Sequence, residues 1–575
     1  MRAPLLSSVL SVLVLSTSVA CSGDKSGGAG DSVGDTGDDG GGDDGGDDGG
    51  GADGGGDDGG CPEVPFYLDA DGDGFGDADQ MVEACEAPDG HVDDATDCDD
   101  TRADVHPGAT DTCEDLDCSG TLDSGAQLVP SAHPTLKEAV DAIADVGLVC
   151  VEAGTYADNL IIEGKQVSIV GAGVGETVLE TGAVGNLLDL SAGAAVTVSH
   201  ATLRSQERLA MVGQADVVLQ DVAIDALDCP NPSGCVGMVA QVTDGTVTIE
   251  RAVISGLELQ ASNDVHGGLI YAFGSAVRPE VVMRDVVVED NVFRSSVTAK
   301  MFDIRQGALE LERVRLENNE VDGAGGAAIF DTRFESIFTA TDVDIIDNVV
   351  LAEDVGAQWL YAEGPVTATR LRVLDNSVDS SDGYVAGFYV DHGDMSLHNA
   401  ILANNIFRTY GSGGYTYGLF MYGGGALSID HADIVANTLD SFVYSGGFAY
   451  LNDWEGAVDF SMTHTNVQEL ALGNGTSGEA EAFAVIWDGT VDMEWNNIWG
   501  VNYTDMWWDG HSFDVADGLS LDALYVDRSA PDAADWDLRL QEASPSRDAG
   551  DAEAQDHDGT RADIGAYGGA MAWTE

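Results

Sequence analysis

A repeat of about 29 residues organises the middle of the chain. Its anchors are six apolar residues spaced 28, 29, 28, 29 and 32 residues apart: Val281, Leu309, Phe338, Val366, Met395 and Leu427. The positions two, five, seven and twelve residues after each anchor are also apolar in all six repeats. Alternation with a period of two predicts strands, and the break between the second and fifth positions predicts a bend. A period near 29 residues predicts one solenoid turn per repeat.

Two kinds of corner residue keep the same register. Ten residues after each anchor stands an asparagine, and glycine recurs two residues before later anchors: Asn291, Asn319, Asn348, Asn376, Asn405, Asn437; Gly307, Gly364, Gly393, Gly425, Gly456, Gly489. Asparagine tolerates a left-handed backbone, and stacked asparagines can share side-chain hydrogen bonds. Between the corners lies a third apolar strand, such as Trp359-Leu360-Tyr361 or Phe388-Tyr389-Val390. We therefore predict an all-β domain, a parallel β-helix with three strands per turn.

The solenoid extends beyond the six regular repeats. Less regular turns begin near Val167, Val196, Val217 and Val247, and later ones near Val458 and Val491. Residues 130–575 then form roughly 11–13 turns, a rod roughly 55–65 Å long. Residues 134–143 carry a capping-box pattern at Thr135 and Glu138 and one apolar helical face, which predicts a short helix that caps the first turn.

Two segments of this region resemble a known superfamily. `LVCVEAGTYADNLIIEGKQVSIVGAG` resembles the first turns of pectinesterase-like proteins, and `DLRLQEASPSRDAGD` with `DHDGTRADIGAYGG` resembles the closing motif of bacterial extracellular β-helix repeat proteins. The resemblance is to the pectate-lyase-like right-handed parallel β-helix superfamily. It implies a right-handed helix, but the superfamily includes lyases, hydrolases, esterases, tailspikes and adhesins, so the fold leaves the function open.

The N-terminus has the pattern of an export signal. A basic residue, an apolar run from Leu5 to Leu15 and small residues before Cys21 resemble a bacterial lipoprotein signal over residues 1–21, although Ser18 replaces the usual Leu. Lipidation of Cys21 would place the protein at the outer membrane or cell surface, and the alternative is secretion. Residues 22–60, almost only Gly and Asp, predict a disordered tether.

The charge of the chain limits the kinds of molecule that it can bind. The net charge of −79 excludes nucleic acid and disfavours anionic polysaccharides as partners, and no segment besides the signal suggests a membrane contact.

Eight cysteines besides Cys21 suggest disulfides in an exported protein. Cys229 and Cys235 flank a Pro/Gly turn and are predicted to pair, whereas Cys150 lies in an apolar strand as a candidate free thiol.

Residues 61–125 form a Cys- and Asp-rich module with two acidic clusters. The first has the alternating carboxylates and sixth-position glycine of a calcium loop, with Asp69, Asp71 and Asp73 as side-chain ligands, the Phe75 carbonyl, and Asp77. Gln80 replaces the twelfth-position glutamate, so a complete EF-hand is not expected. The second cluster supplies further candidate ligands: Asp97, Asp99, Asp100 and Asp104.

This module resembles the MopE-type metal-binding repeat of large bacterial surface proteins, although Cys113–Cys118 is two residues shorter than that pattern. The family name implies copper for one member. Carboxylate oxygens favour calcium, which we predict as the cofactor. The alternative is an acidic, disulfide-bonded spacer without metal.

The search for a catalytic site gives weaker signals. Charges four and six residues after the anchors alternate in sign between turns, which predicts salt-bridge ladders rather than catalytic arginines. Facing carboxylates of a hydrolase could be Asp303 with Asp331 or Asp391 with Asp394. The histidines His392, His398 and His431 lie on neighbouring turns and are interpreted as solvent-facing.

The most informative binding feature is a run of aromatic residues after the twelfth position of three consecutive turns. It comprises Tyr384, Tyr410, Tyr415, Tyr417, Phe442 and Tyr444, with Gly and Ser neighbours. Aromatic faces stack on neutral sugars without positive charge. We predict a non-enzymatic protein with an edge of loops that binds a carbohydrate or cell-surface ligand. Alternatively, the aromatic residues of this edge pack against the rod and bind no ligand. The alternative function is a polysaccharide hydrolase or lyase.

Overall fold

The computed structural model describes residues 63–109, 113–120, 125–227, 238–262, 267–411, 414–441, 444–452, 457–474, 484–486, 489–501, 506–508, 511–512 and 518–573. The predicted signal, Cys21, the Gly/Asp tether, Cys229, Cys235 and Phe442 lie outside these residues. The described residues from Val64 onward belong to one compact unit. Within the described part, no helix is both long and apolar enough to cross a bilayer.

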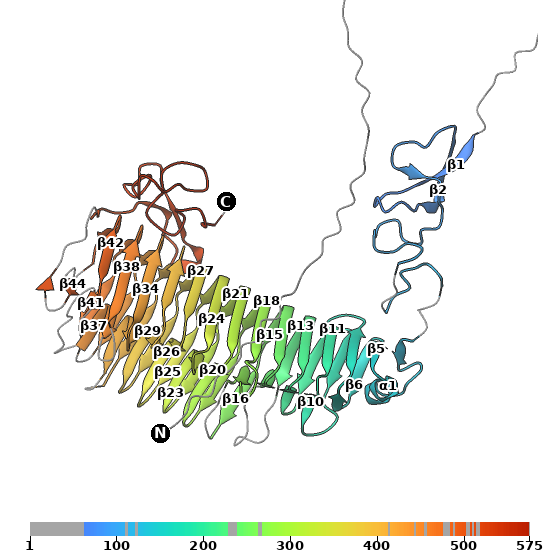
Figure 1. Cartoon of the computed structure of the whole chain (residues 1–575), viewed down its shortest axis with the longest axis horizontal. Helices are drawn as coiled ribbons and strands as arrows, with labels where there is room; N and C mark the ends of the chain where they lie inside the picture. Colours follow the sequence, from blue (N-terminus) through green and yellow to red (C-terminus); the bar gives the residue numbers. More distant parts are fainter. Residues whose placement is uncertain are drawn as a thin grey trace, which may run out of the picture. The chain divides into compact units, whose positions relative to one another are not determined.

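The large unit is built on a parallel β-helix, which confirms the predicted fold class (Figure 1). The sheet that carries the anchors, called the anchor sheet, pairs each predicted anchor with the next: Val281 with Leu309, Phe338, Val366, Met395 and Leu427 in succession. These side chains point inward and are at most 3% exposed. The sixth anchor pairs with Phe460, two residues beyond the predicted Val458.

The bounds of the anchor-sheet strands follow the repeat. Its strands are β4 Gln127–Val129, β5 Val146–Val151, β6 Gly154–Ala157, β8 Gln166–Gly171, β9 Thr177–Glu180, β11 Ala195–Ser205, β13 Asp216–Leu227, β15 Thr246–Ser255, β18 Glu280–Glu289, β21 Ala308–Glu317, β24 Ile337–Ile346, β27 Val366–Leu374, β30 Met395–His398, β31 Ile401–Ala403, β34 Gly425–Asp430, β35 Asp433–Val435, β38 Val458–Thr463, β39 Asn466–Gln468, β42 Val491–Glu494 and β43 Asn497–Trp499. From β30 onward each turn has two short strands because the bend interrupts the ladder.

Two further sheets complete the turns. The short sheet contains β16 Glu258–Ala261, β19 Val292–Ser295, β22 Glu320–Gly323, β25 Val349–Ala352, β28 Ser377–Ser380, β32 Ile406–Thr409, β36 Thr438–Ser441 and β40 Ala471–Asn474. The long sheet contains β7 Leu160–Glu163, β10 Asn186–Ser191, β12 Arg208–Gly213, β14 Ala240–Thr243, β17 Ile270–Phe273, β20 Thr298–Arg305, β23 Gly326–Arg333, β26 Gly356–Ala362, β29 Tyr384–Asp391, β33 Tyr415–Tyr422, β37 Tyr444–Asn452, β41 Ala484–Ile486, β44 Met506–Trp508 and β45 His511–Ser512. Among the described residues, eight turns therefore carry all three strands.

The six predicted asparagines form a buried ladder between the anchor and short sheets. Each side-chain amide from Asn291 to Asn405 donates to the Oδ1 of the next asparagine at 2.9–3.0 Å. Each amide also donates to a main-chain carbonyl, as Asn405 does to Val373 at 2.7 Å. The left-handed residues were predicted one position too late: Asp290, Asn318, Asp347, Asp375, Asn404 and Ala436 have φ of 53–59°. The ladder asparagines form hydrogen bonds with the main-chain groups around that turn.

The bend within the anchor sheet is also left-handed. The residues four after each anchor have φ of 51–55°: Asp285, Arg313, Asp342, Arg370, Asn399 and His431. The predicted charge ladders run along it, because Arg313 Nε lies 2.5 Å from Asp285 and Arg370 Nη2 donates to Asp342 at 2.7 Å. His431 is only 7% exposed, so the prediction that it faces solvent was wrong.

The N-terminal end of the solenoid and part of its outer surface are covered. Helix α1 (Leu136–Ala142) is capped by the Thr135 hydroxyl, which accepts from the Glu138 amide at 3.1 Å, and its buried face packs on β4, β5 and β7 as predicted. Near the C-terminus, η1 (Ala533–Asp535), β46 (Tyr525–Asp527) and β47 (Asp537–Leu540) belong to a segment that covers apolar residues on the outer side of the anchor sheet. A second apolar cluster forms there: Ile346, Leu374, Ile401, Ala403, Val435, Ala523, Tyr525, Ala533, Leu538 and Ala566.

The acidic module has its own small sheet, in which β1 (Val64–Leu68) pairs antiparallel with β2 (Asp77–Ala84) and β3 (His91–Val92). A disulfide joins Cys98 to Cys118, and another joins Cys113 to Cys150. The candidate free thiol of Cys150 is therefore paired. The partner comes from the module, so the disulfide ties the module to β5 of the β-helix.

Candidate functional site

The loop between β1 and β2 gathers three of the predicted metal ligands. Asp69, Asp71 and Asp73 place one carboxylate oxygen each within 4.8 Å of one another. Gly72 and Gly74 have φ of 86° and 98°, a conformation that lets the loop turn tightly around this point. Asp69 accepts the amides of Gly72 at 2.7 Å and Gly74 at 3.2 Å, which fixes its carboxylate.

The second acidic cluster completes the same site. Asp97 and Asp100 lie with Asp71 in a second group of oxygens within 4.8 Å, and Asp100 accepts the Ala70 amide at 2.8 Å. The two residues are 9% and 8% exposed. One oxygen of each of four carboxylates is buried without a hydrogen-bond donor: Asp71 Oδ2, Asp73 Oδ2, Asp97 Oδ2 and Asp100 Oδ2. Orphaned anionic oxygens that face one another at this spacing fit a hard divalent cation.

Burial raises the pKa of Asp97, and the charges of Asp73, Asp71 and Asp100 raise it further, against the lowering effect of the Asp99 amide. A cation among these oxygens would remove that repulsion. The geometry thus fits the calcium that the residue types predict.

Three further predicted ligands, Asp77, Asp99 and Asp104, lie outside the two oxygen groups, and the Phe75 carbonyl stays a prediction. Asp77 accepts the Gln80 side-chain amide at 2.8 Å, Asp99 accepts the Thr101 hydroxyl at 2.6 Å, and Asp104 pairs with Arg102 at 2.7 Å. The ring of Phe75 stacks on His106 with centroids 5.1 Å apart. Gln80 supplies no carboxylate at the twelfth position of the loop, and the second loop brings Asp97 and Asp100 close to Asp71. Such a contact between distant segments leaves no periodic signal in the sequence.

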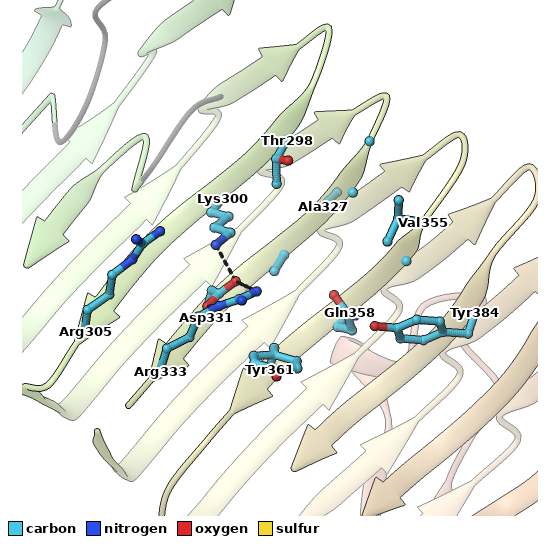
Figure 2. Close-up of a pocket in the computed structure, with 14 residues that line it drawn as sticks. Thr298, Lys300, Arg305, Ala327, Asp331, Arg333, Val355, Gln358, Tyr361 and Tyr384 are labelled. Carbon is cyan, nitrogen blue, oxygen red and sulfur yellow. Dashed lines mark hydrogen bonds and ion pairs between the residues drawn. The ribbon is translucent and has the colours of Figure 1, made fainter. Parts of the chain in front are cut away.

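The outer face of the long sheet holds a pocket of about 430 Å³ over β20, β23, β26 and β29 (Figure 2). Its side chains project outward from neighbouring strands because strand residues alternate between the core and the surface. Lys300, Arg333 and Asp331 line one side, and Gln358, Tyr361 and Tyr384 line the other. The pocket thus combines planar polar groups, charges and aromatic rings.

A buried charge network forms the floor of this pocket. Lys300 Nζ lies 2.6 Å from Asp331 and 3.4 Å from Asp303, and all three residues are at most 5% exposed. Arg305 donates twice to Asp303 at 2.9 Å, and Arg333 donates twice to Asp331 at 2.6 and 3.0 Å. Figure 2 shows Lys300 and Arg333 converging on Asp331.

Asp303 and Asp331, a predicted carboxylate pair, thus lie at the same register on adjacent strands. Each accepts hydrogen bonds from cationic donors, so both carboxylates are held in ion pairs. The two carboxylates of the other predicted pair have different partners: Asp391 accepts from the Tyr361 hydroxyl at 3.2 Å, whereas Asp394 accepts the Ala426 amide at 2.9 Å.

A ladder of aromatic rings continues from the pocket along the long sheet. Tyr361, Tyr389, Phe420 and Tyr450 occupy the same register on β26, β29, β33 and β37, with successive centroids 5.1, 4.6 and 5.6 Å apart. Arg333 lies over the outer Tyr361 ring at 4.6 Å. Burial raises the pKa of Tyr361 and of Tyr389, so both hydroxyls remain donors at neutral pH.

Four predicted edge tyrosines, Tyr384, Tyr415, Tyr417 and Tyr444, lie in strands of the long sheet, whereas Tyr410 lies in the loop before β33 as predicted. Tyr384, Tyr415 and Tyr444 start β29, β33 and β37 and pair in register. Tyr417 is 8% exposed and packs on Phe420 and Tyr450, so it belongs to the packing alternative. Tyr410 and Tyr415 remain 59% and 46% exposed, and half-buried Tyr384 lines the pocket. Sequence reasoning missed the pocket because it searched the loops and not the outward strand positions.

No family profile and no curated protein matches the chain. Solved structures do. The mannuronan C-5 epimerase AlgE6 A-module of Azotobacter vinelandii matches over 64% of this chain and 93% of its own, with 15% identity and a TM-score of 0.28. The PL6 family polysaccharide lyase Pedsa3628 of Pseudopedobacter saltans matches over 74% and 98%, with 11% identity and a TM-score of 0.28. The catalytic domain of a GH87 alpha-1,3-glucanase, solved in complex with nigerose, matches over 74% and 83%, with 9% identity and a TM-score of 0.27.

Proposed function

We propose that this chain is a carbohydrate-binding β-helix protein whose binding site is the pocket and aromatic ladder on the outer face of the long sheet. The observation that carries the proposal is the convergence of Lys300, Asp331, Arg333, Gln358, Tyr361 and Tyr384 around one open pocket. Carboxylate, guanidinium and amide groups form paired hydrogen bonds with vicinal hydroxyls, and aromatic rings cover the apolar patches of a sugar.

The fold itself does not need these polar side chains. The turns that follow Lys300 place Ala328, Gln358 and Ala386 at its register. Likewise, the turns on either side of Asp303 and Asp331 place Tyr271 and Tyr361 there. Buried charges are costly to desolvate, and neighbouring turns have Ala or Tyr at the same register. The charged network therefore points to a role beyond folding.

The ligand we favour is neutral. Three cations gather at the pocket, which the sequence did not predict, but each is ion-paired with Asp303 or Asp331. The surrounding chain is strongly acidic, so an anionic polymer would be repelled. The hydroxyl groups of a neutral sugar can form hydrogen bonds with the ion-paired side chains without this electrostatic repulsion.

Affinity electrophoresis in gels that contain single polysaccharides tests this proposal. We expect at least one neutral polysaccharide to retard the protein, and we expect no release of reducing ends and no unsaturated product from polygalacturonate above a heat-killed control. If none of the polysaccharides tested retards the protein, glycan binding is contradicted. If products accumulate, the alternative of a polysaccharide hydrolase or lyase replaces a non-enzymatic role.

We further propose that the acidic module binds calcium through Asp69, Asp71, Asp73, Asp97 and Asp100. The four orphaned carboxylate oxygens support a cation at this point. Calcium accepts six to eight oxygen ligands in flexible geometry, which suits a site assembled from two loops. Lipidation of Cys21 and a Gly/Asp tether, with display at the outer membrane or cell surface, complete the proposal and rest on the sequence pattern alone.

A further inference from the structure

Three imidazoles from successive turns of the anchor sheet face one carboxylate, far in sequence from the acidic module. Asp430 ends β34, His431 follows it, His464 follows β38, and His398 ends β30. The Nδ1 atoms of His431 and His464 each lie 3.0 Å from Asp430 Oδ1, and His398 Nδ1 lies 3.8 Å from Oδ2. The C-terminal segment covers the group, because Gly565 donates to the His464 carbonyl at 2.7 Å.

Hydrogen bonding alone does not satisfy this group. Asp430 Oδ1 accepts the Thr463 hydroxyl at 2.8 Å and also lies 3.0 Å from the Nδ1 atoms of His431 and His464, so three groups crowd one carboxylate oxygen. In addition, His431 Nε2 is buried without a hydrogen-bond partner, in a residue that is only 7% exposed. The buried ring of His431 is therefore not held by a complete set of hydrogen bonds, which is costly inside a protein.

We propose that Asp430, His431 and His464 bind a divalent transition-metal ion of the zinc class, with His398 as the fourth ligand. Imidazole nitrogen with one carboxylate is a ligand set that zinc accepts, whereas calcium and magnesium require oxygen. Bond lengths of about 2.0–2.1 Å in a tetrahedral site separate ligand atoms by roughly 3.3 Å. The observed separations of 3.0 and 3.8 Å bracket that value.

Metal binding requires two local adjustments. The rings of His431 and His464 are nearly parallel, 12° apart in plane and 4.4 Å apart in centroid, so each turns about its Cβ–Cγ bond to point its lone pair at the ion. His464 Nε2 accepts the Asp551 amide at 3.0 Å. Coordination through Nδ1 puts the imidazole proton on Nε2, so the Asp551 amide loses its acceptor and should exchange faster with solvent.

The chain offers matched variants for the test. Asparagine suits the left-handed backbone at this register, since Asn399 occupies it one turn earlier with φ of 51°. The variant is therefore His431→Asn with His464→Asn, and the control is His392→Asn. His392 is also left-handed, with φ of 59°, but its side chain is 49% exposed and lies outside the group.

Zinc uptake by the whole chain is measured by equilibrium dialysis in excess calcium, which occupies the acidic module. Wild type and His392→Asn should bind one more zinc ion than the double variant, with a higher Tm, and cobalt in place of zinc should give the visible absorption of a tetrahedral site. Faster exchange of the Asp551 amide should accompany uptake. If wild type takes up neither metal, or if the double variant binds as wild type does, the inference is overturned.

Discussion

Replacement of Asn405 by alanine is expected to cost about 4 kcal/mol of unfolding free energy. Asn405 donates to the Val373 carbonyl at 2.7 Å and to Asn437 Oδ1 at 2.9 Å, and it accepts two hydrogen bonds from Asn376 at 3.0 Å. Alanine leaves four buried polar groups without this partner. Each buried unsatisfied group costs about 1–3 kcal/mol, partly offset by relaxation and water entry.

The adjacent Asn404 provides the control. Its amide donates to Asp375 at 2.7 Å from a half-buried position, and the next turn places Ala436 at the same left-handed site with φ of 55°. Asn404→Ala should therefore cost under about 1 kcal/mol. Urea unfolding of both variants measures the difference. Equal losses would mean that a ladder asparagine adds no more stability than the half-buried amide of Asn404.

Neutralising Asp97 and Asp100 together is expected to weaken calcium binding roughly 100-fold or more, because carboxylate charge sets the affinity of such sites. The Asp97→Asn, Asp100→Asn variant is compared by calorimetry with Asp99→Asn. Asp99 lies on the same loop, but its carboxylate binds Thr101 outside the oxygen groups. If Asp99→Asn weakens binding as much, the ligand set proposed from the two loops is wrong. If wild type takes up no calcium, the metal-free spacer is the better description.

The same site should respond to pH in a defined direction. Burial and neighbouring carboxylates raise the pKa of Asp97 above its usual 3.8, so protons compete with calcium in the window just above that value. Calcium affinity should fall as pH drops into this window. Without calcium, the folded state holds this proton more tightly than the unfolded chain, so this group's contribution to stability is lost as pH rises through the window. Calcium should cancel that loss.

The parts of this structure that repeat could be predicted from the sequence. The anchors, the capping helix and the buried asparagines follow from local periodicity, which fixes which residues face the core. The position of the left-handed residue was off by one, because Asp290 and its equivalents take the strained backbone while the asparagine supplies the hydrogen bonds. The residue types indicated a tight corner, but they did not show which of two neighbouring residues adopts the left-handed conformation.

The candidate sites depended on contacts that periodicity does not reveal. Asp71 meets Asp97 and Asp100 only once the module folds, and Cys113 reaches Cys150 across 37 residues. The tyrosines were expected on loops because their Gly and Ser neighbours suggested flexibility, but Tyr384 and Tyr415 begin strands of the long sheet. Lys300, Gln358 and Tyr361 went unnoticed because each is unremarkable alone, and only the stacking of turns brings them to one pocket.

The most direct test of the carbohydrate-binding proposal is calorimetric titration of the retarding polysaccharide into three proteins. These are wild type, Gln358→Ala with Tyr384→Ala, and Gln241→Ala. Gln358 shares its register with Ala328 and Ala386, so alanine there should not disturb the fold. Gln241 projects from β14 of the same sheet, away from the pocket. We predict at least a tenfold loss of affinity for the pocket variant at an unchanged Tm and wild-type affinity for Gln241→Ala; wild-type affinity in the pocket variant would contradict the assignment.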